Sequence, residues 1–138
     1  PGFNNFFIGY IWSMASYGGR LYVGTFDSSI FLRFATGDRV TKWLRRVGAE
    51  TVVGAEGGFD LWSSTDGVTW DLVTRTGFGN PYNYGARTMT ATPAGLFVGT
   101  ANPFGPEVAV RRGDEWRYEL NLDGGLEVWM QRDGAPPS

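Results

Sequence analysis

The chain repeats itself, and the repeat decides its fold. Residues 2–27 read GFNNFFIGYIWSMASYGGRLYVGTFD, and residues 77–102 read GFGNPYNYGARTMTATPAGLFVGTAN. A shift of 75 residues places the first stretch on the second without a gap, with Met14 on Met89. A second pairing, at a slightly shorter offset, sets GGFDLW at 57–62 against GGLEVW at 124–129. We therefore predict that the chain contains two copies of one structural unit.

Each copy has the pattern of antiparallel β structure. Ile11–Tyr17 runs through two glycines into Arg20–Phe26, and Arg87–Thr92 turns at a Pro-Ala-Gly sequence into Leu96–Ala101. Two strands around such a turn predict a hairpin in each copy. Third strands are predicted at Ile30–Ala35 and Glu107–Arg111, and further strands at Glu115–Glu119, Phe59–Ser64, Leu126–Gln131 and Thr69–Thr74. Strands at this spacing indicate an all-β sandwich, barrel or propeller.

One stretch of the first copy, near residues 38–48, breaks the strand pattern. Within Arg39–Val47, apolar residues recur at helical spacing, namely Val40, Trp43, Leu44 and Val47. Asp38 before them is a predicted N-cap, and Gly48 after them is a predicted helix end. We therefore expect a short amphipathic helix, inserted in the first copy only. Its exposed face would carry Lys42, Arg45 and Arg46, either as a solvated surface or as a docking surface for a partner.

Composition narrows the possible functions. The 138 residues include no cysteine and no histidine, and the net charge is −2. The chain therefore lacks disulfides, thiolate ligands and the commonest general base, and we expect no metal site and no cofactor. A small net charge without blocks of like charge argues against a nucleic-acid partner. No apolar run reaches the roughly 20 residues of a membrane-spanning helix, so we expect no membrane span.

Residues 64–70, Ser-Thr-Asp-Gly-Val-Thr-Trp, resemble the Asp-box, the hairpin motif of sialidase-like β-propellers. The turn is one residue shorter than the usual form of the motif. In such a turn Asp66 accepts hydrogen bonds from backbone N–H groups, Gly67 permits a positive φ, and Trp70 packs under the hairpin. Ser64 and Thr69 complete the motif, whose role in the family is structural.

The sequence segments 77–85 and 99–104 also resemble a group of bacterial propeller proteins of uncharacterised function. The resemblance implies β-propeller blades, and it implies a secreted or cell-surface location. On this interpretation residues 1–76 form one four-stranded antiparallel blade with the helical insertion, and residues 77–138 form a second blade of the same propeller domain.

Two blades are too few for a closed ring, because propellers close with about four to eight. The missing blades would come from the rest of a longer parent chain, from copies of this chain, or from other subunits.

The favoured functional hypothesis is a non-catalytic binding or scaffolding module, with carbohydrate as the expected ligand. Loops on a rigid scaffold are where ligands commonly bind. The candidate ligand-binding residues are Trp12, Tyr82, Tyr84, Arg87 and Asn102, which offer stacking faces and polar groups suited to sugar rings.

Two alternatives remain open. In the first alternative the chain supplies part of a sialidase-like glycoside hydrolase, for which the candidate carboxylates are Asp27, Glu56, Asp60 and Glu127. None of them has a spacing that marks a catalytic pair, so no catalytic residue is assigned. The other alternative is a purely structural subunit of a multi-chain assembly.

Overall fold

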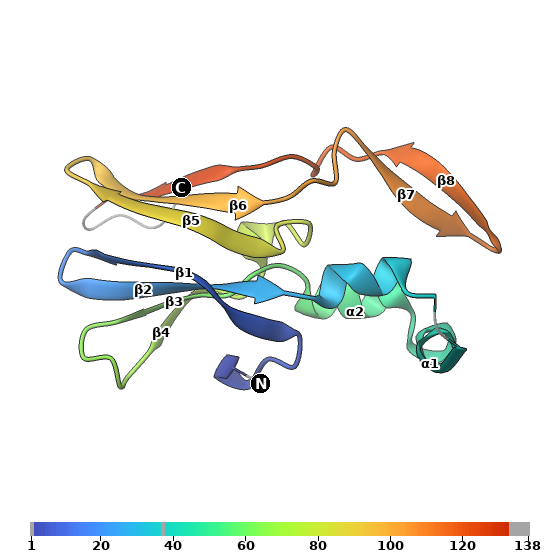
Figure 1. Cartoon of the computed structure of the whole chain (residues 1–138), viewed down its shortest axis with the longest axis horizontal. Helices are drawn as coiled ribbons and strands as arrows, with labels where there is room; N and C mark the ends of the chain where they lie inside the picture. Colours follow the sequence, from blue (N-terminus) through green and yellow to red (C-terminus); the bar gives the residue numbers. More distant parts are fainter. Residues whose placement is uncertain (1, 37, 133–138) are drawn as a thin grey trace.

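The protein is mostly β structure, which confirms the all-β prediction. In the computed structural model, residues 2–36 and 38–132 are described. Antiparallel strands form two facing layers, and the helices lie at one end together with a separate hairpin (Figure 1).

The first unit (residues 2–76) contains four strands that pair in the order of the chain. They are β1 (Ile8–Tyr17), β2 (Arg20–Asp27), β3 (Leu61–Ser64) and β4 (Asp71–Thr74). The β1–β2 turn is tight because Gly18 and Gly19 both take a positive φ, of 57° and 73°. Two positive φ angles in succession suit the twist of a two-residue hairpin turn.

The second unit (residues 77–132) repeats this arrangement with β5 (Gly85–Thr92), β6 (Gly95–Ala101) and β9 (Val128–Gln131). The strand register is also repeated, because Met14 pairs with Val23 in the first unit as Met89 pairs with Val98 in the second. Both hairpins contain a register shift at the same position of the inner strand. The duplication seen in the sequence is thus a structural one.

The two units pack face to face around a shared core. One bridge, Phe26 to Gly85, joins their sheets. The buried residues between them are Tyr22, Phe59 and Leu61 from the first unit and Ala86, Leu96 and Val98 from the second. Close approach depends on Gly24, where a Cβ would lie only 2.4 Å from that of Ala86.

The turn between β3 and β4 forms the hydrogen-bonded network expected of residues 64–70. Asp66 Oδ1 accepts the N–H groups of Val68 and Thr69 at 2.8 and 2.7 Å, and the Ser64 hydroxyl at 3.0 Å. These backbone bonds lower the pKa of Asp66 to about 2. Gly67 has a φ of 75°. The turn lies at the end of the sheet opposite the helices (Figure 1).

The segment between β2 and β3 is helical, and it corrects part of the sequence interpretation. It contains η2 (Ser29–Phe34), α1 (Asp38–Val47) and α2 (Ala49–Glu56). The strand predicted at Ile30–Ala35 is wrong, because these residues form a 3₁₀ helix that buries Ile30 completely. The predicted helix is confirmed as α1, and the N–H of Gly48 closes it on Leu44. The second helix was not predicted.

The second unit carries its own insertion at the same place, between β6 and β9. This insertion is a hairpin of β7 (Glu107–Arg112) and β8 (Glu115–Leu120), which pair only with each other in a separate two-stranded sheet. The strands predicted here are confirmed as strands, but Glu107–Arg111 is not the third strand of its unit. Among the described residues the α-helical insertion occurs only in the first unit, as predicted, and the hairpin insertion of the second unit was not predicted.

Candidate functional site

Polar side chains fix the points where each insertion leaves and rejoins its sheet. In the first unit, the Thr25 hydroxyl accepts the N–H of Asp60 at 2.9 Å. In the second unit, the Thr100 hydroxyl accepts the N–H of Glu127 at 2.8 Å. The two insertions therefore join their sheets through equivalent hydrogen-bonded junctions.

Two of the candidate hydrolase carboxylates, Asp60 and Glu127, lie at these junctions. The fully buried Asp60 accepts hydrogen bonds from the indole of Trp62 at 3.2 Å and the amide of Asn5 at 3.4 Å. Burial raises the pKa of Asp60, and the indole bond partly offsets this effect. Glu127 accepts a hydrogen bond from the indole N–H of Trp129 at 2.7 Å, and it also accepts hydrogen bonds from the side-chain amides of Asn80 and Asn83. The repetition of these bonds assigns both acids to the scaffold.

In each unit, the tryptophan that donates to the acid at the junction is stacked against a phenylalanine. Phe3 stacks on Trp62 at 4.7 Å between ring centroids, and Phe78 stacks on Trp129 at 4.5 Å. Both phenylalanines have a positive φ, of 52° and 60°, which is uncommon outside glycine. The surrounding contacts hold the same unusual backbone conformation at equivalent places.

Asp27 differs from its counterpart in the second unit. It is fully buried, and its Oδ1 accepts the backbone N–H and the hydroxyl of Ser29 at 2.9 and 2.5 Å. Its Oδ2 has no hydrogen-bond partner among the described residues. Burial raises the pKa of Asp27 from 3.8 to about 7. The equivalent residue, Asn102, uses its amide to donate to Asn83 and to the carbonyl of Asp123.

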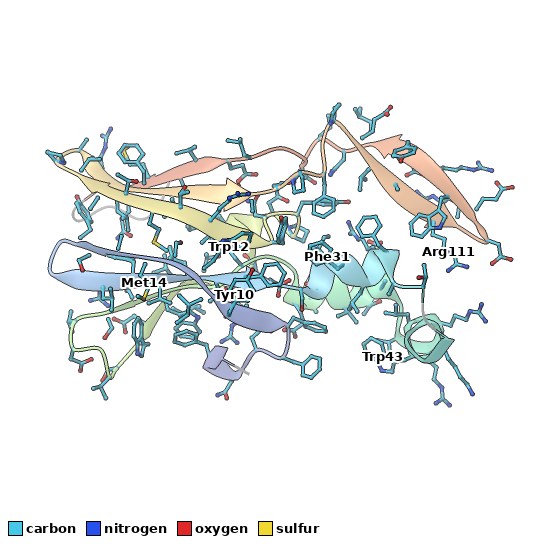
Figure 2. All side chains as sticks on the ribbon, viewed as in Figure 1. Tyr10, Trp12, Met14, Phe31, Trp43 and Arg111 are labelled. Atoms are coloured by element: carbon cyan, nitrogen blue, oxygen red, sulfur yellow. The ribbon has the colours of Figure 1, made fainter. Side chains whose placement is uncertain are left out.

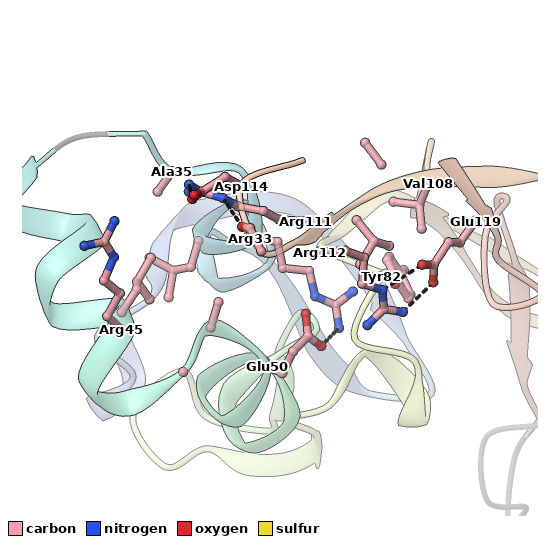
Figure 3. Close-up of a pocket in the computed structure, with 17 residues that line it drawn as sticks. Arg33, Ala35, Arg45, Glu50, Tyr82, Val108, Arg111, Arg112, Asp114 and Glu119 are labelled. Carbon is pink, nitrogen blue, oxygen red and sulfur yellow. Dashed lines mark hydrogen bonds and ion pairs between the residues drawn. The ribbon is translucent and has the colours of Figure 1, made fainter. Parts of the chain in front are cut away.

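The insertions of both units converge on a pocket of about 600 Å³. The helical insertion forms one wall with η2 and α2, the β7–β8 hairpin forms the other, and Tyr82 contributes between them (Figure 3). Four arginines and three carboxylates line it, namely Arg33, Arg45, Arg111, Arg112, Glu50, Asp114 and Glu119. Leu32, Leu44, Val108 and Val110 add apolar surface.

On the helical wall, Arg33 is held from two sides. Its guanidinium donates to Glu50 at 2.7 Å and lies 4.7 Å above the ring of Tyr82. The Arg33 side chain is only 17% exposed, whereas that of Glu50 is 71% exposed. The pair thus presents an anchored cation beside an accessible carboxylate.

On the hairpin wall, Arg112 donates two hydrogen bonds to Glu119, at 2.8 and 2.6 Å. This bidentate bond lowers the pKa of Glu119 and raises that of Arg112. Arg111 donates to the exposed Asp114 at 3.3 Å. All three pocket carboxylates are therefore ion-paired with arginines.

Aromatic rings connect this pocket with the start of β1. Tyr82 contacts Phe104 at 5.5 Å between centroids, and Phe104 stacks with Phe34 at 5.8 Å. Contacts continue through further rings, namely Phe31, Tyr84, Phe26, Trp12 and Tyr10. Tyr10, Trp12 and Phe31 can be followed in Figure 2. The rings form one belt across the end of the sheet that bears the insertions.

The five residues predicted to bind a ligand do not form a single group. Tyr82 lines the pocket. Trp12 contacts Tyr84 at 5.8 Å, and the guanidinium of Arg87 lies 5.9 Å from the Trp12 ring. These three lie farther along the belt. Asn102 is buried and bonded within the scaffold, which makes its role structural.

Arg45 was placed on the charged face of the predicted helix, but the other pocket arginines escaped prediction because they come from segments far apart in the sequence. Arg33 and Glu50 are 17 residues apart, and the hairpin lies in the other repeat. The one available signal was the alternation of arginine and glutamate around Gly113-Asp114. Such an alternation is typical of an exposed, ion-paired hairpin.

Within the described ranges, no three His, Cys, Asp or Glu side chains are grouped as a metal site requires. No helix among the described residues is long and apolar enough to span a membrane. Comparisons with protein-family models, with curated proteins and with solved structures found no match to this chain.

Proposed function

We propose that this chain is a two-blade segment of a β-propeller-type repeat protein, and that it acts as a non-catalytic binding module. The observation that carries the proposal is the convergence of two insertions, one from each repeat, on one pocket. The four-stranded order β1-β2-β3-β4 and the hydrogen-bonded turn at Asp66 support the propeller interpretation. A secreted or cell-surface bacterial location goes with this interpretation.

Ion pairing in the pocket favours binding over hydrolysis. Most glycoside hydrolases need a protonated carboxyl group beside a carboxylate, and sialidases use a tyrosine in place of the nucleophilic carboxylate. Every carboxylate that lines the pocket is paired with an arginine, and the pKa of Glu119 is lowered rather than raised. The pKa of Asp27 would suit a general acid, but this side chain is fully buried and does not line the pocket.

Carbohydrate is the ligand class that we propose. Sugar hydroxyls can donate to the exposed Glu50 and accept from Arg112, while the ring carbons pack on Tyr82 and the apolar wall. A pocket of about 600 Å³ falls within the usual range for small ligands, roughly 300–1,000 Å³.

A glycan-array screen of the purified chain, followed by titration calorimetry, tests the proposal. Ala109 lines the pocket from β7, so Ala109→Phe should fill the pocket and weaken binding of any glycan found. Arg117→Ala is the matched control, because Arg117 is an exposed residue of the neighbouring strand outside the pocket lining.

Equal affinity of Ala109→Phe and the wild type would refute the pocket as the site. Release of product from chromogenic glycosides, lost on one carboxylate substitution, would instead establish the hydrolase alternative.

A further inference from the structure

The interface between the two units shows what covers one face of a unit, here called face B. In the first unit, face B includes Phe59 and Leu61, which are 0% and 1% exposed. Leu96 and Val98 of the second unit share the core with them. Phe78 of the second unit contacts Phe59 edge-on at 5.4 Å between centroids.

Among residues 2–36 and 38–132, no segment covers face B of the second unit in this way. The repeat places Leu126 at the position of Phe59 and Val128 at the position of Leu61. Leu126 is 74% exposed and Val128 is 63% exposed. The same strand position is thus buried in one unit and open to solvent in the other.

The covering surface, here called face A, is also present a second time. In the second unit, face A includes Ala86 and Met89, which pack into the core. The equivalent residues of the first unit are Ile11 and Met14, which are 50% and 59% exposed. Figure 2 labels Met14 on the β1 layer.

We propose that a second copy of this chain docks its face A (Ile11, Met14) on the open face B (Leu126, Val128), head to tail, as the two units dock within one chain. This rests on the repeat-unit part of the proposed function. The chain carries both halves of one interface, and its internal geometry shows that these halves fit. Because the two surfaces differ, the contact is heterologous, and a closed ring, which the propeller interpretation requires, forms when the rotation between successive copies closes.

Two single substitutions separate the two faces. Met14→Asp places a charge on face A, and Val128→Asp places one on face B. Both sites are more than half exposed within one chain, so the thermal unfolding of each monomer should be unchanged. Wild-type chain should show a discrete mass several times 15.2 kDa by light scattering and native mass spectrometry. Each variant alone should remain a monomer.

Mixing the variants makes the test directional. Met14→Asp retains an intact face B and Val128→Asp an intact face A, so a 1:1 mixture should form a dimer and nothing larger. Assembly of Val128→Asp by itself would overturn the head-to-tail contact in favour of a symmetric one through face A.

A wild-type chain that stays monomeric up to millimolar concentration would overturn the second copy as the occupant. Glycan binding by that monomer would still report on the proposed function separately.

Site-directed cross-linking gives a readout that does not depend on mass alone. Leu61 and Leu96 line the same small void in the internal interface, and their repeat equivalents are Val128 and Leu21. Since the chain has no cysteine, Val128→Cys and Leu21→Cys each introduce a single thiol. A short bismaleimide should join the two variants to each other, whereas neither should be joined to itself. Absence of the mixed product would contradict the proposal.

Discussion

Replacing Asp27 by Asn should stabilise the protein at pH 8 and have a much smaller effect at pH 5. In the folded protein Asp27 is buried, Oδ2 lacks a hydrogen-bond partner among the described residues, and the pKa is about 7. In the unfolded chain the carboxyl ionises near its ordinary value of 3.8. Folding therefore opposes ionisation, and wild-type stability declines relative to the variant as pH rises from about 4 through 7.

The size of the effect follows from the shift. A rise from 3.8 to about 7 is roughly three pKa units, which at ~1.4 kcal/mol per unit amounts to about 4 kcal/mol above pH 7. Less than half of this difference is already present at pH 5. The gap between variant and wild type should thus widen by about 2–3 kcal/mol between pH 5 and pH 8. Asn at this position is compatible with the fold, because Asn102 occupies the equivalent place in the second unit.

Urea denaturation at pH 5 and pH 8, followed by circular dichroism, measures the gap. Asp114→Asn is the control, because Asp114 is almost fully exposed on the β7–β8 turn. A gap of the same size at both pH values would refute the reasoning, since it would show that Asp27 does not ionise in this interval. Destabilisation at pH 8 would refute it more directly.

Three further predictions concern the same scaffold. Phe59→Ala should lower the free energy of unfolding by about 3–5 kcal/mol in urea denaturation because Phe59 is fully buried, whereas Leu126→Ala at the exposed equivalent position, made in the monomeric Met14→Asp variant, should stay within about 0.5 kcal/mol. Asp66→Asn should lower the melting temperature at pH 7. Because folding lowers the pKa of Asp66 to about 2, this deficit should shrink as pH falls from about 4 toward 2, as melts across this range would show. Gly24→Val should lower the melting temperature strongly, since a Cβ there meets Ala86 and Met89 of the other unit, but Gly99→Val should be tolerated better in the monomeric Met14→Asp variant, where only the Thr88 side chain is in the way.

The repeated parts of the fold could be predicted from the sequence because a pattern that occurs in both copies is unlikely to arise by chance. Met14 aligns with Met89 in the sequence, and the structure gives both the same register, opposite Val23 and Val98. Helix α1 was accessible because its apolar residues recur at a helical period over ten residues. Its charged face gave a clear contrast between the two sides.

The unrepeated parts were harder to predict for physical reasons. Ile30–Ala35 is a short run with several apolar residues, and such a run does not distinguish a strand from a helical turn until its tertiary partners are known. Helix α2 is short, contains Gly54 and lacks a strong amphipathic pattern, so it depends on packing of the buried Val52 and Val53. The pocket depends on how two such insertions meet, which no local pattern encodes.

The division between repeated and unrepeated parts itself bears on function. The same hydrogen bond holds both insertions to their sheets. The hydroxyl of Thr25 accepts the N–H of Asp60 in the first unit, and the hydroxyl of Thr100 accepts the N–H of Glu127 in the second. A helical segment follows one of these junctions and a β-hairpin follows the other, so the strands do not restrict the structure of the inserted segment. The insertions are therefore free to differ in charge and shape without loss of the core. On the proposed binding function, ligand specificity should therefore depend on Arg33, Glu50, Arg112 and Glu119 rather than on the residues that the repeats share.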